Sequence, residues 1–342
     1  MIEATAPTRI DLAGGTLDIF PLYVFEGGGI TVNAAITLNS RARIVPRQDH
    51  RVVLSSQDLD TVVEADSFDQ LPEGGVMDLA VRILKFYRPS VGVDVELHSS
   101  VPKGSGLGGS SSLLISLSAA LNELNGGRYT REDLINLGAN LEAQSLRIPT
   151  GKQDYYPPAF GGINAIWFNI DGNVLEPLTP GDEILGELEE RLVLTYTAES
   201  RFSGTSNWNM MKQYIDNVGA TVANLRRIKQ TAVEMRQAII ERDLGRFAKL
   251  LSAEWENRKR LARGVTTPRI DQLMAEAHRR GGIASKVCGA GGGGCMITFV
   301  QPGSRQDVIS ALAALGAEDL PFGIARSGVK VRGQRSGVRG QG

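Results

Sequence analysis

The segment with the richest chemistry is PKGSGLGGSSS, which spans Pro102–Ser112. Its four glycines let the backbone curl so that N–H groups point inward. Its last three serines stand at the start of an expected helix, where unpaired N–H groups and the positive end of the helix dipole lie. An ordinary serine-capped turn would need fewer glycines and hydroxyls. The segment therefore predicts an anion-binding loop of the kind that holds phosphate.

Two common classes of phosphate loop do not fit this segment. Gly104, Gly106 and Gly109 match G-x-G-x-x-G, but a dinucleotide-binding fold needs a strand after the helix, and the residues after 127 have a helical pattern. A second match, at 289–294, leads into a strand instead of a helix. The Walker pattern is absent, because the Gly151–Lys152 pair is followed by glutamine. A dinucleotide-dependent oxidoreductase is therefore excluded.

Three motifs in order resemble those of the GHMP kinases, which are named for galactokinase, homoserine kinase, mevalonate kinase and phosphomevalonate kinase. PKGSGLGGSSS resembles their second motif, P-x-x-x-G-L-G-S-S-A. APTRIDLAGGTLD (Ala6–Asp18) resembles the first motif of the sugar kinases, and VCGAGGGGCMITF (Val287–Phe299) resembles the carboxy-terminal glycine motif. The resemblance covers nearly the whole chain. It implies an α+β fold with an N-terminal domain like ribosomal protein S5 domain 2, a ferredoxin-like C-terminal domain, and ATP in the cleft between them.

The resemblance also assigns a nucleotide side to the site. Ser110 and Glu142 match the serine and the acid that bind Mg²⁺ in the family. Gly109 stands where the family usually has serine, so Ser111 is an alternative to Ser110. Glu142 could instead be a solvated helix charge. The residues expected to bind the cofactor are Pro102, Gly104, Ser105, Gly106, Leu107, Gly108, Gly109, Ser110 and Ser111.

Asp154 matches the catalytic aspartate of the family. Phosphoryl transfer requires a cation that bridges phosphate oxygens and a carboxylate that accepts or orients the hydroxyl proton, which agrees with this assignment. Lys152 would keep that carboxylate ionised or contact the transferring phosphate, and Arg9 would do similar work beside it. The alternatives are a loop-capping role for Asp154 and a surface position for Lys152.

The substrate side is expected to contain Asp18, Thr16, Gly291 and Arg201. TGKQDYYPPAFGGINAIWF resembles the D-glycero-D-manno-heptose 7-phosphate kinases, which phosphorylate the anomeric C1 hydroxyl of a sugar phosphate. A phosphorylated substrate needs a second basic site, and Arg201 in ESRFSGTS is the candidate. The alternatives are a kinase of an unphosphorylated sugar, as in galactokinases or fucokinases, a mevalonate kinase, or a non-catalytic binding module.

Composition limits the partners of the protein. The 342 residues carry a net charge of −1, so no overall positive field would attract nucleic acid or an anionic membrane. No apolar run approaches the roughly 20 residues that span a bilayer, and the first residues lack the pattern of a signal peptide. The two cysteines fit a reducing compartment. We therefore expect a cytoplasmic monomer or homodimer that binds ATP and a sugar or sugar phosphate.

The expected domains are 1–180, with the phosphate loop, and 181–331, followed by a flexible basic tail at 332–342. Separate strands are expected within 29–63, and helices at Met77–Phe86, 110–125 and 130–146, the last capped by Thr130. Residues 207–262 are nearly all helical in pattern. The arginine-rich stretch Arg258–Arg263 is interpreted as a solvated helix face, and all three histidines are interpreted as structural.

Overall fold

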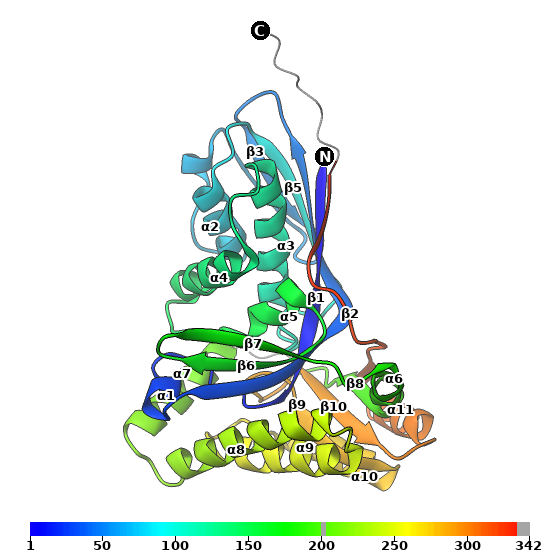
Figure 1. Ribbon diagram of the computed structural model, residues 1–342. Coiled ribbons are helices and arrows are strands. Elements are labelled where there is room, and N and C mark those ends of the chain that lie inside the picture. Colours follow the sequence, from blue (N-terminus) through cyan, green and yellow to red (C-terminus); the bar gives the residue numbers. More distant parts are fainter. Residues whose placement is uncertain (200–202, 334–342) are drawn as a thin grey trace.

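Two β-sheets organise the chain (Figure 1). The computed structural model describes residues 1–199 and 203–333, without the side chains of 203–207. The larger sheet has the strand order β12-β1-β2-β5-β3-β4, and β2 also pairs with β6, which pairs with β7. Its strands are β1 (Ile2–Ala13), β2 (Gly29–Pro46), β3 (Val52–Ser56), β4 (Thr61–Ala65), β5 (Val93–Ser99), β6 (Ile163–Asn169), β7 (Gly172–Leu178) and β12 (Lys330–Gly333).

The strand β2 is one continuous element of 18 residues, where the sequence suggested two shorter strands. The polar Asn39 and Ser40 in its middle do not end it, because β1 pairs along almost the whole of β2 and β5 and β6 pair with its two ends. This long strand carries the larger sheet from the region beside α1 to its pairing with β5 (Figure 1).

Helices cover one face of the upper part of the larger sheet (Figure 1). Among them α3 packs on β1 and β2, directly behind the phosphate loop. The α4 helix begins at the expected cap, because the Thr130 hydroxyl accepts from Asp133 N and the Asp133 carboxylate accepts from Thr130 N. The helical elements of this half are α1 (Leu22–Phe25), η1 (Phe68–Gln70), α2 (Asp78–Tyr87), α3 (Gly109–Leu124), α4 (Arg131–Leu146), η2 (Gln153–Tyr155) and α5 (Tyr156–Phe160).

The smaller sheet has the order β11-β8-β10-β9, and all its pairs are antiparallel. Its inner strand β10 is buried at every position. The strands are β8 (Leu192–Tyr196), β9 (Gly282–Val287), β10 (Cys295–Val300) and β11 (Glu318–Asp319). The helices around it are α6 (Asp182–Arg191), α7 (Ser203–Ile215), α8 (Thr221–Ile240), α9 (Leu244–Arg258), α10 (Pro268–Arg279) and α11 (Arg305–Ala314).

The two sheets share a hydrophobic core. Ile10 and Val32 of the larger sheet pack in the same buried cluster as Leu194 and Phe299 of the smaller sheet, and residues of α8 and α9 belong to this cluster too. The end of the described chain returns to the larger sheet, because β12 pairs with β1. This strand includes Arg332, which was expected in the tail. Residues 334–342 lie outside the described part, and the boundary at 180 stays a prediction. No described helix combines the length and the apolar character that crossing a membrane requires.

Candidate active site

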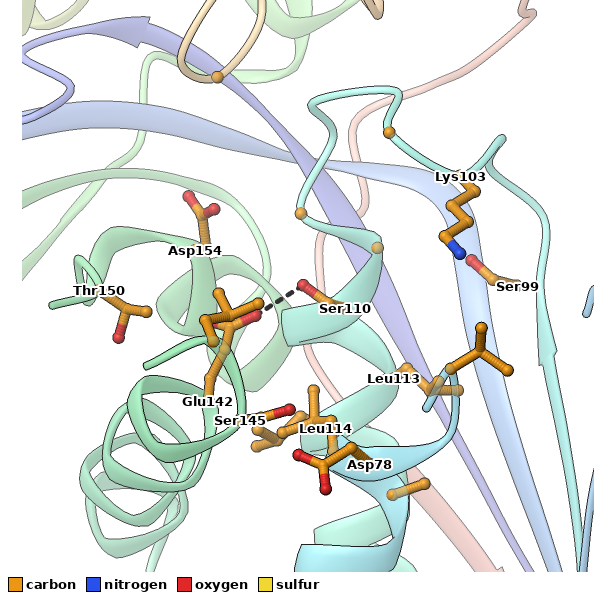
Figure 2. Close-up of a pocket in the computed structure, with 18 of the residues that line it drawn as sticks. Asp78, Ser99, Lys103, Ser110, Leu113, Leu114, Glu142, Ser145, Thr150 and Asp154 are labelled. Atoms are coloured by element: carbon orange, nitrogen blue, oxygen red, sulfur yellow. Dashed lines mark hydrogen bonds between the residues drawn. The ribbon is translucent and has the colours of Figure 1, made fainter. Parts of the chain in front are cut away.

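A cavity of about 1030 Å³ lies between the phosphate loop, the beginning of α2, the end of α4, and the start of the carboxy-terminal glycine loop. Most of its wall comes from the half that contains the larger sheet. The half with the smaller sheet contributes Arg258, Gly289 and Ala290. Figure 2 shows the polar end of this cavity, where Ser110, Glu142 and Asp154 come from three different elements and lie close together.

The phosphate loop is shaped by glycines that no other residue could replace without strain. Gly104, Gly106 and Gly108 have φ values of +72°, +73° and +70°. A Cβ on Gly106 would also lie 2.5 Å from the carbonyl oxygen of Cys288. The second glycine loop is therefore packed directly against the first, and Cys295 N donates to the Ser105 carbonyl at 2.7 Å. The loop ends at the start of α3, where unpaired N–H groups favour an anion.

Ser110 and Glu142 form a pair of hard oxygen donors beside this loop. The exposed Ser110 hydroxyl donates to Glu142 Oε1 at 2.8 Å, which is the dashed line in Figure 2. The other carboxylate oxygen, Oε2, accepts from the Tyr155 hydroxyl. Burial raises the pKa of Glu142, while these two hydroxyls lower it. The pair can bind a small divalent cation, which prefers such oxygens.

Asp154 faces the cavity and is held by one arginine. Arg9 Nε and Nη2 each lie 2.8 Å from Asp154 Oδ1, and Arg9 Nη1 donates to the Gly106 carbonyl. The Asp154 side chain is 32% exposed and that of Arg9 only 3%. Burial alone would lower the pKa of Arg9, but Asp154 and Asp11 raise it above its usual range. Arg9 therefore stays charged and joins the carboxylate to the phosphate loop.

The carboxylate of Asp18 lines the same cavity as that of Asp154. Its Oδ2 accepts from Gln153 N at 3.0 Å, and its Oδ1 accepts from Gln153 Nε2 at 3.4 Å. The backbone of Gly151 also lies so close to Asp18 that a Cβ at this position would be 1.8 Å from Asp18 Oδ2. Burial, with the nearby Asp154, raises the pKa of Asp18 to about 6. Asp18 can change charge near neutral pH and can accept hydrogen bonds from hydroxyl groups when it is ionised.

Most of the expected site residues lie on the wall of this one cavity. They are Arg9, Thr16, Asp18, Pro102, Gly104, Ser105, Gly106, Gly108, Gly109, Ser110, Glu142 and Asp154. Between the two candidates for the metal contact, Ser110 reaches the cavity, whereas Ser111 is 1% exposed.

Three further expected residues are placed elsewhere. Lys152 Nζ donates to Asn136 at 2.9 Å, so its ammonium group does not pair with Asp154. The side chain of Leu107 is in the core between the sheets, and Gly291 packs against the carbonyl of Val265. Arg201 lies outside the described residues.

The interpretation of Arg258 as a solvated charge is wrong. Its side chain is 1% exposed, lines the cavity and pairs with the fully buried Glu254, with Nη2 and Oε1 at 3.0 Å. The i, i+4 spacing of Glu254 and Arg258 is the same for an inner and an outer helix face, so it could not distinguish the two. Arg258 Nη1 also donates to the Thr16 hydroxyl at 3.5 Å, which connects α9 to the first motif.

Four further residues in the cavity wall or behind it were not expected from the sequence. They are Gln153, Tyr155, Asp11 and Lys286. Lys286 is a charged residue inside a strand that is otherwise apolar or small, and Asp11 shares a strand face with Arg9. These two patterns in the sequence could have indicated Lys286 and Asp11. Gln153 and Tyr155 have no signal beyond their position beside Asp154.

Comparison with known proteins agrees with this geometry. Residues 76–162 match the GHMP kinases N terminal domain, and residues 235–318 match the GHMP kinases C terminal domain. The chain is 30% identical to the D-glycero-alpha-D-manno-heptose 7-phosphate kinase of Campylobacter jejuni, over 96% of this chain and 98% of that protein.

Solved structures show the same architecture. A D-glycero-D-manno-heptose 1-phosphate kinase of Bacteroides thetaiotaomicron has a TM-score of 0.80 and 26% identity, covering 98% of this chain and 100% of that one. The galactokinase of Lactococcus lactis has a TM-score of 0.75 at 21% identity, covering 96% and 95% of the two chains, and supports the fold alone. The expectation of a two-domain, ATP-dependent kinase is confirmed, and the chain belongs to the GHMP kinase family.

Proposed function

We propose that the protein transfers the γ-phosphate of ATP to the anomeric C1 hydroxyl of a sugar phosphate, D-glycero-D-manno-heptose 7-phosphate. The observation that carries the proposal is the pair of carboxylates Asp154 and Asp18 in one cavity beside the anion-binding loop. The heptose 7-phosphate kinase of Campylobacter jejuni, which is similar over nearly its whole length, supports the choice of sugar.

Asp154 is the group that receives or orients the proton of the attacking hydroxyl. Its partly exposed carboxylate faces the cavity, and Arg9 holds one of its oxygens, so the other oxygen is available to a hydroxyl. The charged Arg9 is bonded to the Gly106 carbonyl, which places its guanidinium beside the loop that would hold the phosphates. Phosphoryl transfer depends mainly on such positioning and on electrostatic stabilisation.

The donor set formed by Ser110 and Glu142 fits Mg²⁺. Mg²⁺ uses one or two carboxylates, and phosphate oxygens and waters complete its shell. The described residues contain no group of three or more histidine, cysteine or acidic side chains arranged for a metal, so a site shared with the nucleotide is the arrangement that fits. When bound, the ion would neutralise the negative charge that develops on the phosphate groups. Ser110 and Glu142 would hold it at the first turn of α3.

Asp18 would select a polyol as the acceptor. A carboxylate can accept hydrogen bonds from two neighbouring hydroxyls, which a sugar offers. An unphosphorylated sugar is the second candidate, because an L-fucokinase/L-fucose-1-P guanylyltransferase of Bacteroides fragilis is 27% identical over 86% of this chain. The phosphate contact of Arg201, the cytoplasmic location and the monomeric or homodimeric state stay predictions.

A panel of acceptors tests the proposal. ADP release would be measured with Mg²⁺ and ATP across heptose 7-phosphate, other sugar phosphates, free fucose and galactose, and mevalonate. The highest kcat/KM is expected for the heptose phosphate, and phosphorus NMR would identify an anomeric phosphate in the product. A higher kcat/KM for a free sugar would replace the proposed substrate with the second candidate. Intact ATP binding without turnover of any acceptor would contradict kinase activity in this chain.

A further inference from the structure

Three consecutive residues of one short turn bring three acidic side chains together, because the middle residue is an acid and each of its neighbours contacts another. The turn is η2, Gln153–Tyr155, a single 3-10 turn between α4 and α5. Gln153 donates to Asp18, Asp154 accepts from Arg9, and Tyr155 donates to Glu142. A 3-10 helix has three residues per turn, so successive side chains point in directions about 120° apart. The turn therefore reaches the sugar side, the reacting centre and the metal side at once.

Resting on the proposed function, we propose that Gln153 and Tyr155 are positioning residues that fix Asp18 and Glu142 relative to Asp154. Gln153 would orient the Asp18 carboxylate, which binds the sugar hydroxyls. Tyr155 would orient the Glu142 carboxylate, which binds Mg²⁺ together with ATP. The distances between the three acids would then be determined by one rigid segment of backbone, because each residue shares a peptide bond with the next.

The contacts of Gln153 support a positioning role on the sugar side. Gln153 donates to both oxygens of the Asp18 carboxylate. Its backbone N donates to Oδ2 and its side-chain Nε2 donates to Oδ1. Its carbonyl accepts from Asn33 Nδ2 at 3.5 Å, which fixes the peptide to β2. Its side-chain Oε1 is buried without a hydrogen-bond partner in the described part of the chain, so the contact with Asp18 orients the amide.

The contacts of Tyr155 support the same role on the nucleotide side. Its ring is fully buried, and its hydroxyl reaches Glu142 Oε2 while Ser110 reaches Oε1. Both oxygens of the carboxylate are thus directed by hydroxyl groups. Tyr156, the next residue, is 6% exposed but its ring lies against Phe160 and Phe168, away from the three acids. The sequence places two similar tyrosines in a row, and only the first contacts the site.

Two conservative variants should separate the sugar side from the nucleotide side. Gln153→Leu should raise KM for the acceptor about tenfold or more and leave the affinity for a non-hydrolysable ATP analogue with Mg²⁺ unchanged. Tyr155→Phe should raise the Mg²⁺ concentration for half-maximal binding of that analogue about tenfold, measured by calorimetry, and leave the acceptor KM within about twofold. Tyr156→Phe is the matched control and should change neither. Gln153→Asn keeps the amide but is too short to span the same gap, and should behave like Gln153→Leu.

The outcomes are distinct for the two proposals. If each variant changes acceptor and nucleotide binding by equal factors, or if neither differs from Tyr156→Phe, the positioning role is overturned. If wild-type protein phosphorylates no sugar phosphate, the proposed substrate fails, and the acceptor measurement is made with whichever panel member is turned over. The calorimetric measurement needs no acceptor, so it decides the role of Tyr155 in either case. Thermal unfolding of each variant checks that the fold is retained.

Discussion

Asp11 and Lys286 form an ion pair that is buried from solvent and joins the two halves of the chain. Lys286 Nζ lies 2.6 Å from Asp11 Oδ2 and 2.6 Å from the Asp11 carbonyl, and the two side chains are 1% exposed or less. Asp11 Oδ1 accepts in turn from Gly289 N at 2.8 Å. The first motif therefore holds the start of the second glycine loop, which is packed against the phosphate loop.

Breaking this pair from one side should destabilise the protein strongly. Lys286→Met would leave the Asp11 charge buried without its main partner, a situation that costs about 3–5 kcal/mol. The double variant Asp11→Asn, Lys286→Met should recover part of this loss, because it removes the uncompensated charge. Urea denaturation would measure both. Lys212→Met, which breaks an exposed pair with Asp216, is the control and should change the free energy of unfolding by less than about 1 kcal/mol. Equal effects of Lys286→Met and Lys212→Met would contradict this account.

The local features of the fold could be predicted from the sequence. The phosphate loop followed by α3 and the capping box at Thr130 each depend on a few adjacent residues. Asp154, Asp18 and Glu142 could be assigned through motifs, and they line one cavity.

The partners of the charged residues could not be predicted in the same way. Lys152 is two residues from Asp154, yet the turn of the backbone directs it to Asn136. Arg258 pairs within its own helix whether that face is buried or solvated, and only packing against the first motif decides which. The position of Arg258 depends on a contact with Thr16, which is more than 200 residues away, and a local pattern does not contain such a contact.

Gly106→Ala should weaken ATP binding, because its Cβ would overlap the Cys288 carbonyl and force the two glycine loops apart. A tenfold or larger rise in the dissociation constant of an ATP analogue is expected by calorimetry. Gly303→Ala is the matched control: its φ is +80°, close to the +73° of Gly106, and open space surrounds it. The control should lose only the ~1–2 kcal/mol of stability that a left-handed alanine costs. Similar nucleotide affinities of the two variants would exclude loop separation as the cause.

Asp154→Asn should lower kcat by about two orders of magnitude or more, since it removes the group that receives or orients the hydroxyl proton. The affinity for an ATP analogue should stay within a few-fold, because the phosphate loop is unchanged. ADP release would measure kcat, and calorimetry would measure the affinity for the ATP analogue. Asp171→Asn in the exposed β6–β7 turn is the control. Normal kcat in Asp154→Asn would remove the residue from the reaction.

Asp18→Asn should make the protein more stable above pH 6 while weakening acceptor binding. The pKa of Asp18 is raised to about 6 from 3.8, mainly by burial, so the wild-type protein loses stability as the pH rises through that range and the buried carboxyl ionises. Asparagine stays neutral, and its side-chain carbonyl can still accept from Gln153 N. The gain in unfolding free energy should be near zero below pH 4 and reach about 3 kcal/mol above pH 6. Urea denaturation from pH 3 to 8 would measure it, with Asp171→Asn as the control. A gain that is constant across this range would show that ionisation of Asp18 is not its cause.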